Sequence, residues 1–293
     1  MADTSDPPEG SKPAPALDPG LYIVATPIGN LRDMTYRAVD TLKAADLIAC
    51  EDKRVTAKLL QAYGIRTTAT SYHEHNAAKV RPHLIRQLRE GARIALVSDA
   101  GTPLVSDPGY RLVTEAVEAG IPVVAIPGAS ATLAALASSA RPTDRFLFAG
   151  FLPPRGGKRR TALQELAGID ATLILFESPR RLAEALADMV EILGPRPAAI
   201  ARELTKRFEE IRRGTLAELA GHYAAADAPL GEIVVVIGPP GAESDGAAPD
   251  LDALLQQAMA DMSLRDAAAS VAEATGLPRR DIYARALALR QDR

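Results

Sequence analysis

Ala95-Leu-Val-Ser-Asp-Ala-Gly-Thr-Pro-Leu-Val-Ser-Asp-Pro-Gly109 is the stretch that decides the fold. It continues an apolar run that begins at Ile94, and such a run predicts a buried strand of a parallel sheet. The Ser, Asp, Gly and Pro residues that follow predict a loop, in which Gly101 permits a close approach to a ligand and Pro103 and Pro108 fix the path. Ligands bind at the carboxyl ends of parallel strands, and this loop is longer than an ordinary strand-to-helix connection. The stretch therefore predicts a ligand site.

Strand and helix patterns alternate on both sides of this stretch. Apolar runs at 21–25, 46–50, 68–71 and 122–126 predict further strands, and helical patterns separate them. This βαβα order with short connections predicts an open, mainly parallel sheet that is covered by helices on both faces.

A second α/β domain is predicted to begin near Arg145. Strand patterns recur at 145–149, 171–176, 198–202 and 232–237, and residues 208–212 are a candidate hairpin strand. The start of the chain is Pro-rich and acidic, and residues 239–250 are mostly Gly, Ala, Ser, Asp, Glu and Pro. Such segments have too few apolar residues to form a hydrophobic core. We therefore expect a disordered tail at 1–19, α/β domains at 20–143 and 144–238, a linker at 239–250 and a helical segment at 251–293.

Composition excludes several classes of protein. The chain has 293 residues, a net charge of -3 and one cysteine, Cys50. This net charge creates no global positive field toward nucleic acid, although a local basic patch is compatible with it. A single cysteine excludes a disulfide framework within the chain and suits a reducing cytoplasm. No apolar run approaches the length of a membrane span, so we expect a cytoplasmic protein with no membrane partner.

The helical segment at the end of the chain has two interpretations. Ser263 caps one predicted helix, and Gly276-Leu-Pro278 predicts a turn before the next. Two short helices with a Gly-containing turn are typical of a helix-turn-helix, and equally of a small bundle that packs on its own domain. Its six arginines are balanced by six acidic residues, so strong duplex binding by this segment alone is not expected.

Three loops at predicted strand ends combine Gly and Pro with a hydroxyl or a carboxylate. They are Thr26-Pro-Ile-Gly29, Asp99-Ala-Gly-Thr-Pro103 and Ile126-Pro-Gly-Ala-Ser130. Together they predict a rigid cleft lined by backbone for a ligand with an adenosine end and an amino-acid end. Neither a G-x-G-x-x-G after the first strand nor a P-loop occurs, which leaves a dinucleotide or nucleoside triphosphate site unsupported.

The longer motifs of the chain carry a family resemblance. They are Tyr22-Ile-Val-Ala-Thr-Pro-Ile-Gly-Asn-Leu31, Cys50-Glu-Asp-Lys-Arg54, Tyr72-His-Glu-His-Asn76, Val97-Ser-Asp-Ala-Gly-Thr-Pro-Leu-Val-Ser-Asp-Pro-Gly-Tyr110, Ile126-Pro-Gly-Ala-Ser-Ala131, Gly150-Phe-Leu-Pro153, Phe176-Glu-Ser-Pro-Arg-Arg-Leu182, Ala201-Arg-Glu-Leu-Thr-Lys206 and Gly231-Glu232. Over residues 21–238 the chain resembles the tetrapyrrole-methylase family, in the branch that methylates the 2'-oxygen of a cytidine ribose in bacterial 16S ribosomal RNA.

The resemblance implies a fold, a cofactor and partners. The fold is two α/β domains with S-adenosylmethionine in the cleft between them, followed by a small helical segment. The partners are 16S ribosomal RNA or the assembled small ribosomal subunit, and a second copy of the chain in a homodimer. The implied cofactor-binding residues are Pro27, Asp99, Gly101, Pro103, Pro127, Ser130 and Ala131, with Leu152 and Phe176 from the second domain.

Candidates for a general base follow the second and third strands. A ribose hydroxyl is a poor nucleophile, and a base accelerates such a step by roughly 10² to 10⁴-fold. Glu51, His73 and His75 are the catalytic candidates, with Asp52 and Glu74 beside them. Each also has a structural interpretation, as a helix cap or as a contact to backbone or RNA phosphate. The His-Glu-His run has no apparent third ligand, so we expect no metal.

RNA binding requires positive charge. We expect Arg155, Lys158, Arg159 and Arg160 to form a mobile basic loop, interrupted by two glycines, that closes over RNA, with Arg180 and Lys206 nearby. Neutralising the three basic residues at 158–160 is then expected to weaken RNA methylation far more than cofactor binding.

Two alternatives stand beside RNA methylation. One is a methyltransferase that acts on a tetrapyrrole carbon. A change in visible absorbance when a porphyrinoid is added would favour this alternative. The other is a non-catalytic RNA-binding or ribosome-assembly factor, which would bind subunits without cofactor turnover. The basic residues at 155–160 and Tyr72-His-Glu-His-Asn76 favour RNA as the substrate.

Overall fold

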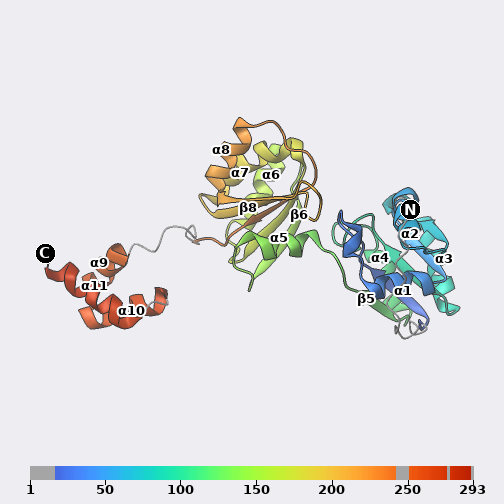
Figure 1. The fold of residues 1–293 in the computed structure, drawn as a ribbon, viewed down its shortest axis with the longest axis horizontal. Coiled ribbons are helices and arrows are strands. Elements are labelled where there is room, and N and C mark those ends of the chain that lie inside the picture. The colour runs from blue at the N-terminus through green and yellow to red at the C-terminus, as the bar shows by residue number, and fades with distance from the viewer. Residues whose placement is uncertain (1–16, 242–250, 276–277, 292–293) are drawn as a thin grey trace, which may run out of the picture. The chain divides into compact units, whose positions relative to one another are not determined.

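The computed structural model describes residues 17–241, 251–275 and 278–291. The chain divides into two compact units, Met1–Pro240 and Gly241–Arg293, which we describe separately (Figure 1). Most of the predicted tail at 1–19, most of the predicted linker at 239–250 and the Gly276-Leu277 part of the predicted turn lie outside the described residues.

The first unit begins with a parallel five-stranded sheet. Its strands are β1 (Gly20–Val24), β2 (Leu47–Cys50), β3 (Ala69–Ser71), β4 (Arg93–Val97) and β5 (Val123–Ile126). They lie in the order β3-β2-β4-β1-β5, and every neighbouring pair is parallel. The parallel sheet predicted from the βαβα order is confirmed, with β4 at its centre.

Helices cover both faces of this sheet because its strands are apolar on both sides. Helices α1 (Tyr36–Ala44) and α2 (Lys53–Ala62) pack on the face that carries Tyr22 and Val24. Helices α3 (Glu74–Arg89) and α4 (Tyr110–Glu118) pack on the face that carries Leu21 and Ile23. A short 3-10 helix, η1 (Leu31–Asp33), follows the loop after β1.

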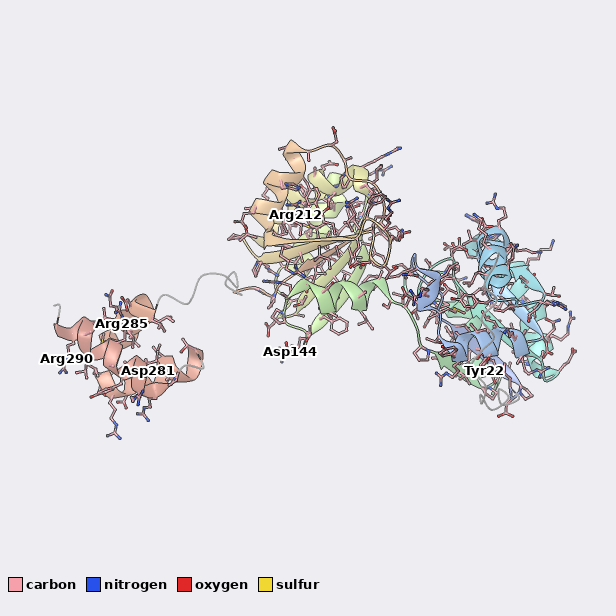
Figure 2. All side chains as sticks on the ribbon, viewed as in Figure 1. Tyr22, Asp144, Arg212, Asp281, Arg285 and Arg290 are labelled. Carbon is pink, nitrogen blue, oxygen red and sulfur yellow. The ribbon has the colours of Figure 1, made fainter. Side chains whose placement is uncertain are left out.

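A second, mixed sheet follows in the same unit. Its strands are β6 (Phe146–Phe151), β7 (Thr172–Glu177), β8 (Pro197–Arg202), β9 (Glu210–Thr215) and β10 (Ile233–Ile237), in the order β6-β7-β10-β8-β9. Strands β6 and β7 are parallel, and the other pairs are antiparallel. The predicted hairpin strand exists, although it starts two residues later than expected. Tyr22 and Arg212 mark the two sheets in Figure 2.

Both faces of the second sheet are also covered. Helices α6 (Gly156–Leu166), α7 (Leu182–Leu193) and α8 (Leu216–Ala225) share one core with it, and the short η2 (Pro179–Arg181) precedes α7. Helix α5 (Ala131–Ser139) packs on the other face, against β8 and β10. The predicted boundary at 143/144 placed α5 with the first sheet, whereas its apolar contacts assign it to the second.

The second unit consists of three helices in the described residues. Helices α9 (Leu251–Asp261), α10 (Leu264–Thr275) and α11 (Arg279–Gln291) enclose a small core that includes Leu255, Val271 and Ile282. Ser263 accepts a hydrogen bond from the backbone N–H of Asp266, as expected of a helix cap. Asp281, Arg285 and Arg290 lie on α11 (Figure 2). Across the described residues, none of the helices combines the length and apolar character that crossing a membrane requires.

Candidate functional site

Hydrogen bonds join the loops that follow β4, β1 and β5. Thr26 and Gly101 exchange two backbone hydrogen bonds of 2.9 and 3.0 Å, which form an antiparallel bridge between the loops after β1 and β4. The Thr102 hydroxyl donates to the carbonyl of Ala129, 3.3 Å away, in the loop after β5. The three Gly/Pro loops therefore lie side by side, because β4, β1 and β5 are neighbours in the sheet.

A cavity of about 260 Å³ lies where these loops meet the second sheet. Four of the predicted cofactor residues line it: Gly101, Ser130, Ala131 and Phe176. Thr102, Phe151 and Glu232 line it as well and were not predicted. Phe151 and Phe176 meet edge to face with ring centroids 5.4 Å apart, so one wall is aromatic. A pocket that is mostly apolar with a few polar groups is typical of small-molecule sites.

The remaining cofactor candidates lie elsewhere. Pro27 and Asp99 line an adjoining cavity of about 290 Å³. The Asp99 carboxylate accepts the backbone N–H of Asp52 at 3.0 Å, so it ties the loop after β4 to the loop after β2. Pro103 is buried and Pro127 is exposed, and neither lines these cavities. Leu152 packs in the core of the second sheet.

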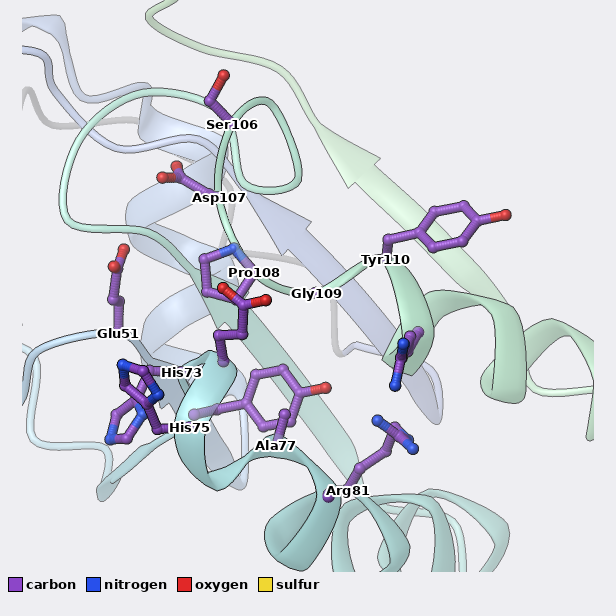
Figure 3. A pocket seen from close by; sticks show the side chains of 14 residues that line it. Glu51, His73, His75, Ala77, Arg81, Ser106, Asp107, Pro108, Gly109 and Tyr110 are labelled. Atoms are coloured by element: carbon purple, nitrogen blue, oxygen red, sulfur yellow. The ribbon is translucent and has the colours of Figure 1, made fainter. Parts of the chain in front are cut away.

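A larger cavity, of about 690 Å³, opens on the other side of the β4 loop (Figure 3). All three catalytic candidates line it: Glu51 after β2, and His73 and His75 after β3. Ser106 and Asp107 line this cavity and also the 260 Å³ cavity. The β4 loop is therefore the wall that the two cavities share.

Carboxylates gather at this wall. Burial raises the pKa of Glu51, and the negative charges of Asp107 and Asp99 raise it further. Asp52 behaves differently because its hydrogen bonds with Arg54 lower its pKa to about 2. Asp52 also caps α2 by accepting the N–H of Arg54 at 2.8 Å, so its structural interpretation is confirmed.

The two histidines flank the first residue of α3, Glu74. His73 precedes the helix, and its backbone N–H donates to Asn76 Oδ1 at 2.9 Å. His75 is in the first turn, with the two imidazole centroids 6.0 Å apart. Within the described residues, no group of three or more His, Cys, Asp or Glu side chains is arranged to hold a metal ion.

Two arginines, Arg81 and Arg111, also line the larger cavity. Arg81 Nε donates to Glu115 Oε1 at 2.6 Å, and burial raises the pKa of the neighbouring Tyr72. Arg111 is exposed on α4 and makes no ion pair within the part of the chain that the structure describes. Arg111 was not predicted from the sequence, although it lies two residues beyond the decisive stretch. An unpaired arginine at a cavity rim can contact a phosphate.

The predicted mobile basic loop is wrong. Residues 156–166 form α6, and Arg159 is 1% exposed within it. Arg159 pairs with Asp188 at 2.6 Å and with Glu184 at 3.1 Å. Arg160 pairs with Asp188 and Glu191. Both arginines therefore hold α6 against α7, and Arg159 is not available to RNA.

The other predicted RNA-binding residues divide into two groups. Arg155, Lys158 and Arg180 are exposed and make no ion pair within the described residues. Lys206 contacts the carboxylates of Glu203 and Glu232 at 2.9 and 3.2 Å. Three of the six candidates thus keep an unpaired positive charge.

Basic residues also gather in the second unit. Arg265, Arg279 and Arg280 line an open depression of about 500 Å³ together with Tyr283. The sequence did not predict this basic cluster, because the segment as a whole has equal numbers of arginines and acidic residues. Arg285, in contrast, pairs with Asp252 at 2.6 Å and joins α11 to α9.

Comparison with known proteins defines the class of protein. Residues 20–220 match the family described as tetrapyrrole (corrin/porphyrin) methylases. A cobalt precorrin-4 methyltransferase, 18% identical, covers 74% of this chain and 94% of its own with a TM-score of 0.55. A uroporphyrin-III C-methyl transferase from Thermus thermophilus, complexed with S-adenyl homocysteine, is 20% identical and covers 74% and 96% with a TM-score of 0.51. The first unit has the tetrapyrrole methylase fold.

Closer relatives identify the branch within this class. Ribosomal RNA small subunit methyltransferase I of Mesorhizobium japonicum is 59% identical over 279 residues, 95% of each chain. The protein of the same name from Halalkalibacterium halodurans is 48% identical over 274 residues, 90% of this chain and 93% of its own. Residues 245–290 match the RsmI C-terminal HTH domain. The chain belongs to the ribosomal RNA small subunit methyltransferase I family, and the resemblance carried by its motifs is confirmed.

Proposed function

We propose that this chain transfers a methyl group from S-adenosylmethionine to the 2'-oxygen of a cytidine ribose in 16S ribosomal RNA. The observation that carries this proposal is the pair of cavities that share the β4 loop as a wall. One has the apolar, aromatic lining that suits a nucleoside-bearing cofactor, and the larger one has the charged lining that suits a nucleotide. The substrate is 16S ribosomal RNA or the assembled small subunit that contains it, and the enzyme works as a homodimer in the cytoplasm.

The residues of the smaller cavity fit S-adenosylmethionine. Gly101 has φ +81° and presents backbone rather than a side chain, which permits a close approach. Phe151 and Phe176 offer an aromatic wall for the adenine, and the hydroxyls of Thr102 and Ser130 offer polar contacts. When bound, the cofactor supplies an already activated sulfonium methyl group. The protein then has to align the acceptor and exclude water.

The tetrapyrrole alternative has weaker support. The two tetrapyrrole methyltransferase structures compared above are 18% and 20% identical to this chain, a level of identity that supports a shared fold but not a shared substrate. The relative at 59% identity carries the name of a ribosomal RNA methyltransferase over 95% of both chains. An RNA acceptor also gives the unpaired Arg155, Lys158 and Arg180 a ligand.

The decisive experiment uses small subunits purified from cells that lack this gene. Labelled S-adenosylmethionine and the purified protein are added, and nuclease digestion then maps the labelled nucleotide. We expect label on a cytidine 2'-oxygen. Label on a base, or transfer to a porphyrinoid and not to subunits, would contradict the proposal. Subunit binding without any transfer would favour the non-catalytic assembly factor.

Neutralising the unpaired cations should reduce RNA binding selectively. We expect the triple variant Arg155→Ala, Lys158→Ala and Arg180→Ala to weaken small-subunit binding at least about tenfold at moderate salt and to flatten its salt dependence, because each phosphate contact releases counterions. Filter binding across a salt series measures this, and calorimetry should give an unchanged S-adenosylhomocysteine affinity. Arg145→Ala, which removes an exposed arginine paired with Asp170, is the matched control. An equal loss of subunit affinity in this control would show that Arg155, Lys158 and Arg180 do not form a specific RNA-binding surface.

A further inference from the structure

The loop between β4 and α4 contains one titratable side chain that faces both cavities. Ser106 and Asp107 are the described residues that line the 690 Å³ cavity and the 260 Å³ cavity alike. Glu51, His73 and His75 line the larger cavity alone. A methyl transfer requires donor and acceptor to meet, so the reacting atoms belong at this junction and not deep in either cavity.

The backbone around Asp107 is held in conformations that few residues adopt. Leu104 has φ +78° and Ser106 has φ +63°, both in the left-handed region. Gly109 has φ +138°, and a Cβ there would lie 2.8 Å from Leu96 Cδ2 and 2.9 Å from Leu104 Cδ2. Such conformations persist where the surroundings enforce them, and they are concentrated at functional sites. The loop is therefore built to hold the Ser106-Asp107 pair in one place.

The surroundings of Asp107 suit a proton acceptor. Burial and the negative charge of Asp99 raise the pKa of Asp107, although a hydrogen bond with Ser98 opposes the shift. A carboxylate whose pKa is raised toward neutral pH is a better general base than an ordinary exposed one. Glu51 lines the larger cavity with Asp107, and Figure 3 shows both carboxylates in the left half of the view.

We propose that Asp107 is the catalytic base, which accepts the proton of the ribose 2'-hydroxyl at the junction of the two cavities. This inference rests on the proposed function. As the O–H bond breaks toward the Asp107 carboxylate, the 2'-oxygen forms a bond to the methyl carbon and the carbon–sulfur bond breaks. The sulfur keeps the electron pair and becomes a neutral thioether, and the proton passes from Asp107 to water. Glu51 and the two histidines then position the nucleotide in the larger cavity.

Asp107→Asn tests the assignment because it keeps the shape of the side chain and removes the base. We expect the rate of methyl transfer to small subunits to fall at least about 100-fold, the lower end of what a general base contributes. Affinity for S-adenosylhomocysteine by calorimetry, and affinity for small subunits by filter binding, should stay within about threefold of the wild type. The melting temperature at pH 7 should not fall, because the variant removes a partly buried charge that the folded state disfavours.

Two further variants make the outcome specific. Asp40→Asn changes an exposed aspartate on α1 that makes no hydrogen bond or ion pair within the described residues, and it should leave every measurement unchanged. Glu51→Gln should reduce subunit affinity more than the rate at saturating subunit. A rate for Asp107→Asn within threefold of the wild type would overturn the assignment, as would a 100-fold loss for Glu51→Gln alone.

The failure of the proposed function gives a different result. If the wild-type protein binds S-adenosylhomocysteine yet methylates no subunit, the ribose acceptor is refuted, and with it the proton transfer assigned to Asp107. If the wild type is active and Asp107→Asn loses S-adenosylhomocysteine binding, Asp107 is a cofactor ligand and not a base. Only an active wild type with a slow variant that binds both partners supports the assignment.

Discussion

Gly101→Ala is expected to weaken S-adenosylhomocysteine binding at least about tenfold, a loss of about 1.4 kcal/mol. Gly101 has φ +81°, and a Cβ there would lie 3.3 Å from Ile28 Cγ2. Ile28 lies in the loop after β1 and packs with α5 and the second sheet. A methyl group at residue 101 would therefore push apart the loops that line the cofactor cavity and strain the Thr26–Gly101 bridge. Calorimetry with the purified variant measures the loss.

Gly91→Ala separates this effect from backbone strain. Gly91 has φ +92°, and a Cβ there would meet no atom within 4 Å. Both substitutions carry the cost of a left-handed conformation, about 1–2 kcal/mol, and both should lower the melting temperature. Only Gly101→Ala should affect the ligand. Equal affinity in the two variants would show that the cavity beside Gly101 is not the cofactor site.

Arg159→Ala is expected to lower the free energy of unfolding by about 3 kcal/mol, because removal of one partner leaves a buried charge without compensation. Asp188 would lose its 2.6 Å contact and keep only a 3.3 Å contact with Arg160. For a domain of this size, the melting temperature should fall by about 6–12 °C. Thermal unfolding followed by circular dichroism measures the change.

Arg160→Ala is the matched control for this prediction. Its side chain is 40% exposed, so its ion pairs are screened by solvent and contribute less than about 1 kcal/mol. The Arg159 variant, assayed below its melting temperature, should keep its affinity for small subunits. A stable Arg159→Ala protein with lost subunit binding would restore the RNA-binding role that the sequence predicted for Arg159.

Most of the fold follows from local patterns in the sequence. Apolar runs bounded by Gly, Pro and Asp predicted the strands of the first sheet. A strand that is buried on both faces needs apolar side chains at nearly every position, so its sequence is easy to recognise. The placement of α5 did not follow, because an alanine-rich helix is apolar on every side and nothing in its own sequence selects the sheet it joins. Its contacts with β8 and β10 depend on residues far along the chain.

The sequence led to the residues of the candidate site whose place depends on backbone geometry, and it missed those whose place depends on packing between distant segments. Gly101 and Ser130, which the sequence predicts as cofactor residues, line the smaller cavity, because a glycine in a strand-end loop and a helix-capping serine are recognisable from their own surroundings in the sequence. Arg159 was misassigned because its acidic partners, Glu184 and Asp188, lie on another helix. Asp107 lies in the decisive stretch but was not predicted as a site residue, because only the three-dimensional path of the loop shows that its side chain lines two cavities.

The strand order β3-β2-β4-β1-β5 has a consequence for changing what this enzyme methylates. The loops after β1 and β5 lie on the side of the central strand where we propose the methyl donor binds, and the loops after β2 and β3 lie on the side proposed for the acceptor. Under this proposal, the first sheet contributes to donor and acceptor recognition through separate loops, which meet at the loop after β4. Grafting the segments after β2 and β3 from a relative with another acceptor should redirect the methyl group while the donor site stays intact.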